Sequence, residues 1–146
     1  MSRQLQLVLE LEQKKEDKLA LQYGQASDAL KNEQDRLLGL QNYRTEYIQQ
    51  VHNTGQNGLS SAGFQRLQVF IGQLDKACGQ QQGKIDNAEK VVQQRRALWL
   101  QQQRKRKSLE HLLTKQAEAK QQAAQKEEQK MLDEFAMLKA RQQKVF

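Results

Sequence analysis

The sequence contains no proline and only one cysteine among its 146 residues. Proline removes a backbone hydrogen-bond donor and clashes with the preceding helical turn, so its absence leaves long helices uninterrupted. The single cysteine, Cys78, excludes a disulfide within the chain and is typical of a reducing compartment. No run approaches the roughly 18 consecutive apolar residues of a membrane-spanning helix, and the N-terminus lacks the apolar segment of a signal peptide. We therefore expect a cytoplasmic protein.

Apolar residues are scarce but regularly placed. They make up 37% of the chain, the mean hydropathy is −0.94, and about one residue in five is glutamine. This polar composition is typical of disordered chains. However, the apolar residues recur at alternating spacings of three and four, which is the pattern of a coiled-coil seam. The spacing therefore favours long paired helices over disorder.

Two series carry this spacing. In the first, ten of fourteen positions are apolar: Leu5, Leu9, Glu12, Glu16, Leu19, Tyr23, Ala26, Leu30, Glu33, Leu37, Leu40, Arg44, Tyr47 and Val51. In the second, eleven of fifteen are apolar: Phe64, Leu67, Ile71, Leu74, Cys78, Gln81, Ile85, Ala88, Val92, Arg95, Trp99, Gln102, Arg106, Leu109 and Leu113. A cluster of glycine, asparagine and serine separates the two series and predicts a loop.

The predicted fold is all-α, a two-helix antiparallel coiled coil that forms one hairpin over residues 1–146. We expect helix one at about 4–52, a loop at about 53–62 and helix two at about 62–141. Ser60 or Ser61 is the expected N-cap of helix two. Pairing Val51 with Phe64 leaves the end of helix two without a partner, and residues 114–130 contain no large apolar side chain. The second helix should therefore extend past the N-terminus of the first.

Two groups of apolar residues exceed what one seam can cover. The first lies beside the loop and includes Tyr43, Tyr47 and Phe70. It is either extra packing that clamps the turn or a docking patch on the surface. The second lies near the C-terminus, at Met131–Leu138. It is either a frayed tail or an amphipathic binding face.

The net charge of +7 is concentrated in the middle of the chain, where residues 52–110 carry ten lysines and arginines against four acidic residues. The basic cluster at 95–107 surrounds Trp99, a combination that suits either nucleic acid or a solvated helix face. Because Trp99 lies on the seam series, we favour the solvated face and expect no nucleic acid. An acidic partner for this basic region is plausible.

Neither catalysis nor metal binding is indicated. His52 and His111 have no companion ligands at metal-binding spacing, and Cys78 lies on the seam. We expect a protein that is not an enzyme and has no cofactor. The stripe formed by Gly72, Gly79 and Gly83 either softens the helix or permits close backbone approach, and the sequence leaves both open.

Several motifs in order resemble the FliJ family of flagellar type III export proteins over nearly the whole chain. They are YRTEY at 43–47, a Gly/Asn loop, FIGQLDKA at 70–77, a basic stretch with Arg96 and Trp99, and QKMLDEFA at 129–136. The resemblance implies a coiled coil similar to the central stalk, or γ subunit, of rotary ATPases. It further implies a cytoplasmic protein peripheral to the inner membrane.

The resemblance also implies partners. They are the hexameric export ATPase FliI, its regulator FliH, the export gate protein FlhA and export chaperones. The gate contacts would be Leu40, Tyr43, Tyr47, Phe70, Leu74 and Ala77. The ATPase contacts would be Leu5, Leu9, Met131, Leu132 and Phe135. The leading hypothesis is a stalk that promotes assembly of the ATPase ring and links it to the gate; the alternatives are a chaperone escort and a nucleic-acid-binding coiled coil.

Overall fold

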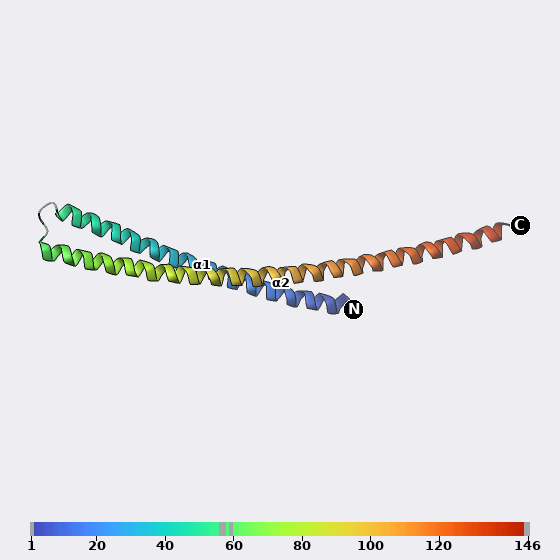
Figure 1. Cartoon of the computed structure of the whole chain (residues 1–146). Coiled ribbons are helices and arrows are strands. Elements are labelled where there is room, and N and C mark those ends of the chain that lie inside the picture. Colours follow the sequence, from blue (N-terminus) through green and yellow to red (C-terminus); the bar gives the residue numbers. More distant parts are fainter. Residues whose placement is uncertain (1, 56–57, 59, 145–146) are drawn as a thin grey trace. The chain divides into compact units, whose positions relative to one another are not determined.

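The structure is a computed structural model that describes residues 2–55, 58 and 60–144. Its two helices are α1 (Ser2–Gly55) and α2 (Ser61–Lys144), which a short loop joins (Figure 1).

Residues that come earlier in α1 contact residues that come later in α2. Glu33 of α1 contacts Gln81 of α2, whereas the earlier residue Gln22 contacts the later residue Arg95. The two helices are therefore antiparallel, and α2 is the longer. This confirms the predicted all-α fold of two antiparallel helices with a longer second helix.

Helix α1 ends three residues later than its expected end at residue 52. Within this added turn, the hydroxyl of Thr54 donates a hydrogen bond to the carbonyl of Gln50 at 2.8 Å, so its side chain is satisfied inside the helix. The amide of Gly58 then donates to the carbonyl of Gly55 at 3.1 Å. Gly58 has φ of +90°, a conformation that costs glycine little because it has no Cβ. The turn is consequently shorter than the expected loop.

Helix α2 begins with a serine cap. The amide of Gly63 donates to the side-chain oxygen of Ser60 at 3.2 Å, and the amide of Phe64 donates to the Ser60 carbonyl at 3.0 Å. Ser60 thus satisfies amides that would otherwise lack partners in the first turn. Of the two serines predicted as the cap, Ser60 is the cap and Ser61 is the first helical residue.

The chain divides into two compact units, which are described separately below. The tip unit is Asp17–Gln101 and contains the loop. The terminal unit consists of Met1–Glu16 and Gln102–Phe146.

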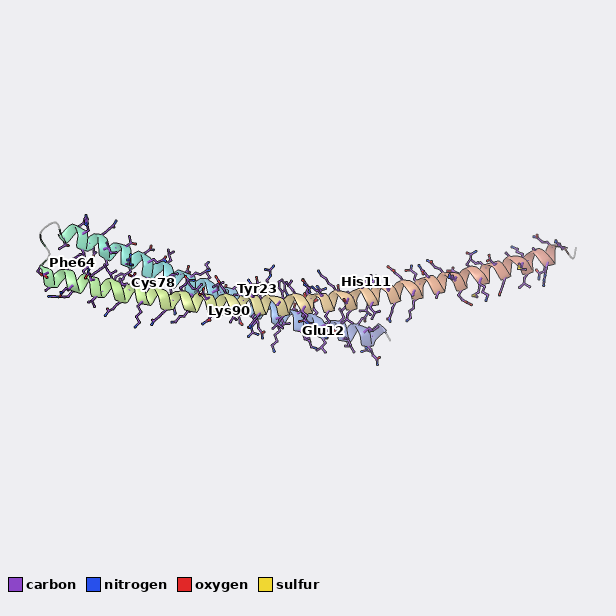
Figure 2. The ribbon with its side chains drawn as sticks, in the orientation of Figure 1. Glu12, Tyr23, Phe64, Cys78, Lys90 and His111 are labelled. Atoms are coloured by element: carbon purple, nitrogen blue, oxygen red, sulfur yellow. The ribbon has the colours of Figure 1, made fainter. Side chains whose placement is uncertain are left out.

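The predicted seam is confirmed almost position by position. All fourteen positions of the first series are buried or half-buried, and so are fourteen of the fifteen in the second. The exception is Phe64, which lies in the first turn of α2 beside the loop and is 53% exposed (Figure 2). Beyond Leu113, the last covered position of α2, every described side chain is exposed. The second helix therefore continues past the last position that the seam covers.

Candidate functional site

At the tip unit, three aromatic rings from the two helices pack together. The Phe70 ring lies 4.3 Å from that of Tyr47 and 6.1 Å from that of Tyr43, the latter in an edge-to-face arrangement. Phe70 and Tyr47 are half-buried, whereas Tyr43 is 51% exposed. The structure thus brings together three of the six predicted gate contacts, and Tyr43 is the most exposed of the three.

The other three predicted gate contacts belong to the seam. Leu74 is only 8% exposed and is one of the most buried apolar residues of the chain. Leu40 and Ala77 are half-buried. Leu74 therefore stabilises the helix pair, and any partner that binds this region meets the edges of the cluster instead. Close by on α2, a shallow hollow runs along one face: its lining is Ala62, Gln65, Arg66, Val69, Phe70 and Gln73.

Polar residues within the seam pair with each other across the two helices. In the tip unit, Nε2 of Gln81 donates to the backbone carbonyl of Glu33 at 2.8 Å and also to its carboxylate. In the terminal unit, Nε2 of Gln102 donates in the same way to the carbonyl of Glu12, at 3.1 Å, and to its carboxylate. The two glutamates are 21 residues apart on α1, and the two glutamines are 21 apart on α2. Both pairs therefore keep one register, separated by three heptads.

Hydrogen bonding and nearby cations favour the charged form of Glu12. The hydrogen bond from Gln102 lowers the pKa of this carboxyl, burial opposes the shift, and Lys105 and Lys15 reinforce it at 3.5 and 3.4 Å. One turn further, the guanidinium of Arg106 donates to both carboxylate oxygens of Glu16. That contact raises the pKa of Arg106, with a further contribution from Glu110 at 2.9 Å.

Two further cross-helix contacts in the tip unit could not be recognised from the seam pattern. Arg44 forms an ion pair with Asp75, with Nε and Oδ1 2.7 Å apart, and Arg95 donates to Gln22 at 3.1 Å. Each pair joins a seam residue to one outside the seam series. A register derived from Val51 opposite Phe64 would have placed Glu12 and Glu33 within one residue of their glutamine partners. The same register does not identify pairs in which only one residue belongs to the seam series, such as Arg44 with Asp75.

Trp99, the aromatic residue within the basic cluster, already packs against another aromatic ring. Trp99 stacks on Tyr23 of α1, with ring centroids 5.6 Å apart and planes inclined by 12°. Both rings are half-buried, in agreement with their seam positions. Because one face of the indole is covered by tyrosine, the stacking platform that single-stranded nucleic acid requires is reduced.

In the terminal unit, the predicted ATPase contacts are of two kinds. Leu5 and Leu9 are half-buried in the seam, as are Leu109 and Leu113 of α2. Three others lie on the exposed part of α2, with exposures of 57–65%: Met131, Leu132 and Phe135. The structure does not bring the two groups together.

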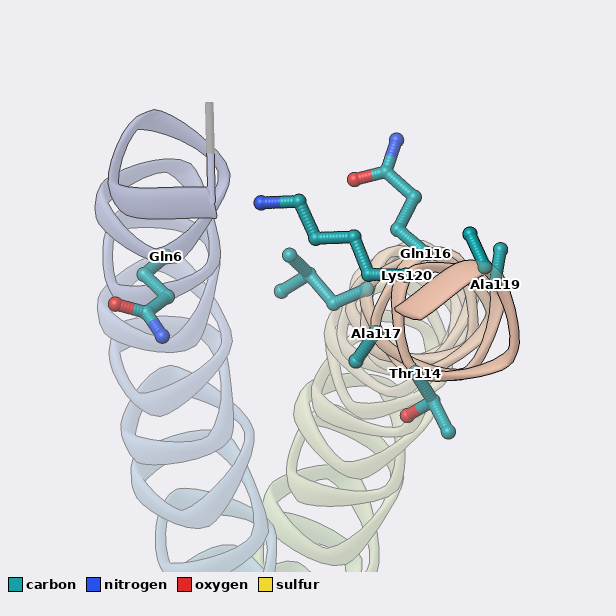
Figure 3. A pocket seen from close by; sticks show the side chains of 8 residues that line it. Gln6, Thr114, Gln116, Ala117, Ala119 and Lys120 are labelled. Carbon is teal, nitrogen blue, oxygen red and sulfur yellow. The ribbon is translucent and has the colours of Figure 1, made fainter. Parts of the chain in front are cut away.

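A hollow of about 770 Å³ lies where the pairing of the helices ends. It is lined by Gln6 of α1 and by residues of α2 from Leu113 to Ala123 (Figure 3). Ala117 lies on the side of α2 toward α1 and is too small to fill the space, whereas Ala119 lies on the other side of α2 (Figure 3). The hollow is open and mostly apolar, so it suits an apolar side chain better than a polar substrate.

The model of the family described as Flagellar FliJ protein matches residues 1–144. The chain belongs to the FliJ family. FliJ proteins are structural components of the flagellar export apparatus. No curated protein and no solved structure gives a significant match. Within residues 2–55 and 60–144, neither helix has a segment apolar enough to cross a lipid bilayer.

Proposed function

We propose that this FliJ-family chain is a stalk in flagellar type III export. Its terminal unit would contact the hexameric export ATPase FliI and promote assembly of the ring, and its tip unit would contact the export gate protein FlhA. On this proposal it acts in the cytoplasm, at the inner membrane, alongside the ATPase regulator FliH and export chaperones. Its contribution would be to bind the ATPase and the gate protein and to position them relative to each other.

The exposed part of α2 carries the proposal. Met131, Phe135 and Leu138 are spaced by four and three residues and form one apolar stripe, each more than half exposed. An exposed stripe of this kind on a charged helix marks a protein contact. The open hollow beside Gln6 adds a second apolar feature in the same unit.

At the tip unit, Tyr43 supports the gate contact. Its ring is half exposed and is positioned by Phe70, which itself packs against Tyr47. Aromatic side chains held rigidly at a surface are frequent binding hot spots. The buried Leu74 would serve this contact indirectly, by holding the two helices together.

The ATPase contact is tested by retention of the full chain on the hexameric ATPase. Met131→Ala with Phe135→Ala should weaken binding by at least about tenfold, since two exposed anchors are lost. Met137→Ala is the matched control, because Met137 is equally exposed but lies two residues from Phe135, on another side of the helix. Unchanged retention of the double variant would refute this part of the proposal.

The gate contact is tested with Tyr43→Ala, and Leu38→Ala serves as the control of similar exposure on the same helix. We expect Tyr43→Ala alone to weaken binding to the gate protein by about tenfold, with helicity by circular dichroism unchanged. Equal binding by the two variants would contradict the assignment. Loss of helicity would instead favour the view that the cluster only clamps the turn.

A chaperone escort is the alternative function. The stripe at Met131, Phe135 and Leu138 has the spacing of helices that bind in a hydrophobic groove, which a chaperone could offer. This alternative predicts tight complexes with export chaperones and no change in ATP hydrolysis by the ring. Stimulated hydrolysis that depends on Phe135 would favour the stalk.

A further inference from the structure

One face of α1 in the terminal unit is both apolar and basic. Leu7, Val8 and Leu11 are 42–57% exposed, although α1 is paired with α2 along this segment. Lys14 and Lys15 follow and are also exposed. Counted from Leu7, these five residues occupy positions i, i+1, i+4, i+7 and i+8, which lie on one side of a helix. We call this the outer face of α1.

Two of the three acidic residues between positions 7 and 16 point away from this face. Glu12 and Glu16 are only 5% and 6% exposed and are engaged by Gln102 and Arg106 in the seam. Glu10 lies at the margin of the outer face, one residue before Leu11. The carboxylates of Glu12 and Glu16 are thus turned toward α2, whereas Lys14 and Lys15 stay exposed beside the leucines, and Lys15 also pairs with Glu12 at 3.4 Å.

We propose that the outer face of α1 binds an anionic lipid surface, with α1 lying in the plane of the interface. Basic amphipathic helices bind membrane surfaces, and lysines beside an apolar patch can extend their ammonium groups to anionic headgroups while the leucines are buried. The other exposed apolar stripe of this unit, at Met131 and Phe135, is flanked by Asp133 and Glu134. Those carboxylates would be repelled by anionic headgroups and offset the nearby Lys130 and Lys139, so charge complementarity favours α1.

The arrangement of the helices permits this contact without unfolding. Leu5 and Leu9 face α2, and Leu7 and Leu11 lie two residues further along, about 200° around the helix. The side of α1 that meets lipid is therefore opposite the side that meets α2. The seam can stay closed while the outer face is buried at the interface. This inference does not depend on the ATPase or gate contacts.

The test is flotation of the full chain with vesicles. Vesicles of phosphatidylcholine with about 30 mol% phosphatidylglycerol should bind the chain, and pure phosphatidylcholine vesicles should bind it far less. Each lysine near such a surface adds about fivefold to binding, so Lys14→Gln with Lys15→Gln should weaken it by about 25-fold. Raising salt from about 0.05 to 0.5 M should have a similar effect.

Two matched controls separate this face from the general positive charge of the chain. Lys126→Gln with Lys130→Gln removes the same charge from an exposed part of α2 and should change binding by less than about threefold. Leu7→Gln with Leu11→Gln should lower binding about tenfold or more. Leu21→Gln with Leu38→Gln, at positions of similar exposure, should not.

Three results would overturn the proposal. One is no flotation with anionic vesicles at low salt. Another is equal loss of binding in both lysine pairs, which would indicate diffuse attraction to net charge. The third is unchanged binding by the Leu7→Gln, Leu11→Gln variant when its circular dichroism matches that of the unmodified chain.

Discussion

Gln81 on α2 holds Glu33 on α1 at two points, the backbone carbonyl and the carboxylate. Within the described residues, no buried side-chain nitrogen or oxygen lacks a hydrogen-bond partner. Polar pairs inside a coiled-coil seam usually lower stability and specify register instead. The equivalent pair of Glu12 and Gln102 lies three heptads away. If one helix shifted along the other, both pairs would lose their hydrogen bonds at once.

Removing one member of this pair should cost more than removing both. Gln81→Leu leaves the Glu33 carboxylate without its cross-helix donor and should lower the free energy of unfolding by about 1–3 kcal/mol. Glu33→Leu combined with Gln81→Leu should restore or exceed the original stability, because a matched apolar layer replaces the pair. Urea unfolding measures both. The pairing would be contradicted if the double variant lost as much free energy of unfolding as Glu33→Leu and Gln81→Leu lose together when measured singly.

Acid should weaken the helix pairing in the terminal unit. The pKa of Glu12 is lowered from its ordinary value of 4.5, chiefly by the hydrogen bond from Gln102. A carboxyl whose pKa is lower in the folded state stabilises the fold above its unfolded pKa. That stability is lost as the pH falls below about 4.5 and through the lowered folded value. Hydrogen exchange of residues 3–11, compared at about pH 6 and pH 3.5 after correction for intrinsic rates, should show less protection in acid.

Glu12→Gln is the control for this pH effect. The amide oxygen can still accept a hydrogen bond from Gln102, but the side chain no longer titrates. Its protection of residues 3–11 should depend less on pH than that of the unmodified chain. If both chains lose protection equally, other carboxyls govern the acid response.

The Tyr23–Trp99 stack should be a main stabilising contact of the tip unit. Trp99→Ala removes a large half-buried ring and should cost about 2–3 kcal/mol, less than for a fully buried tryptophan. Trp99→Phe keeps an aromatic partner for Tyr23 and should cost less than half as much. Thermal unfolding followed by circular dichroism gives both values. Equal stability of Trp99→Ala and the unmodified chain would show that the stack contributes nothing.

The helical glycines have no close neighbours in the described part of the chain. A Cβ added at Gly72, Gly79 or Gly83 would meet no atom within 4 Å, so close backbone approach within the chain does not explain them. Gly79→Ala should therefore stabilise the fold by about 0.4–1 kcal/mol. Gly58→Ala should destabilise it by about 1 kcal/mol, because φ there is +90°. Destabilisation by Gly79→Ala would indicate a contact that the isolated chain does not make.

Spacing alone predicted the helices and nearly all of the seam, since a 3-4 pattern specifies which face of each helix is covered. It could not predict that Phe64 is exposed, because residue spacing does not say how fully α1 covers a large ring in the first turn of α2, beside the loop. It also placed the end of α1 three residues early, because the Asn, Thr and Gly at 53–55 are weak helix formers and yet belong to the helix.

The candidate sites were less predictable than the fold. Leu74 and Tyr43 belong to the same predicted patch, yet one is buried and the other exposed. Periodicity places Leu74 on the seam, but it does not say how far a large ring such as Tyr43 reaches out of it. Cross-helix pairs such as Arg44 with Asp75 depend on side-chain length and rotamer, which residue spacing does not encode.

On the proposed function, described residues 114–144 of α2 lie outside the seam and are covered by the export ATPase in the complex. Hydrogen exchange of the full chain should be compared with and without the hexameric ATPase. We predict fast exchange across residues 114–144 in the free chain and strong protection around Met131–Leu138 in the complex. Strong protection of this segment in the free chain, or no gain of protection on binding, would refute the stalk proposal.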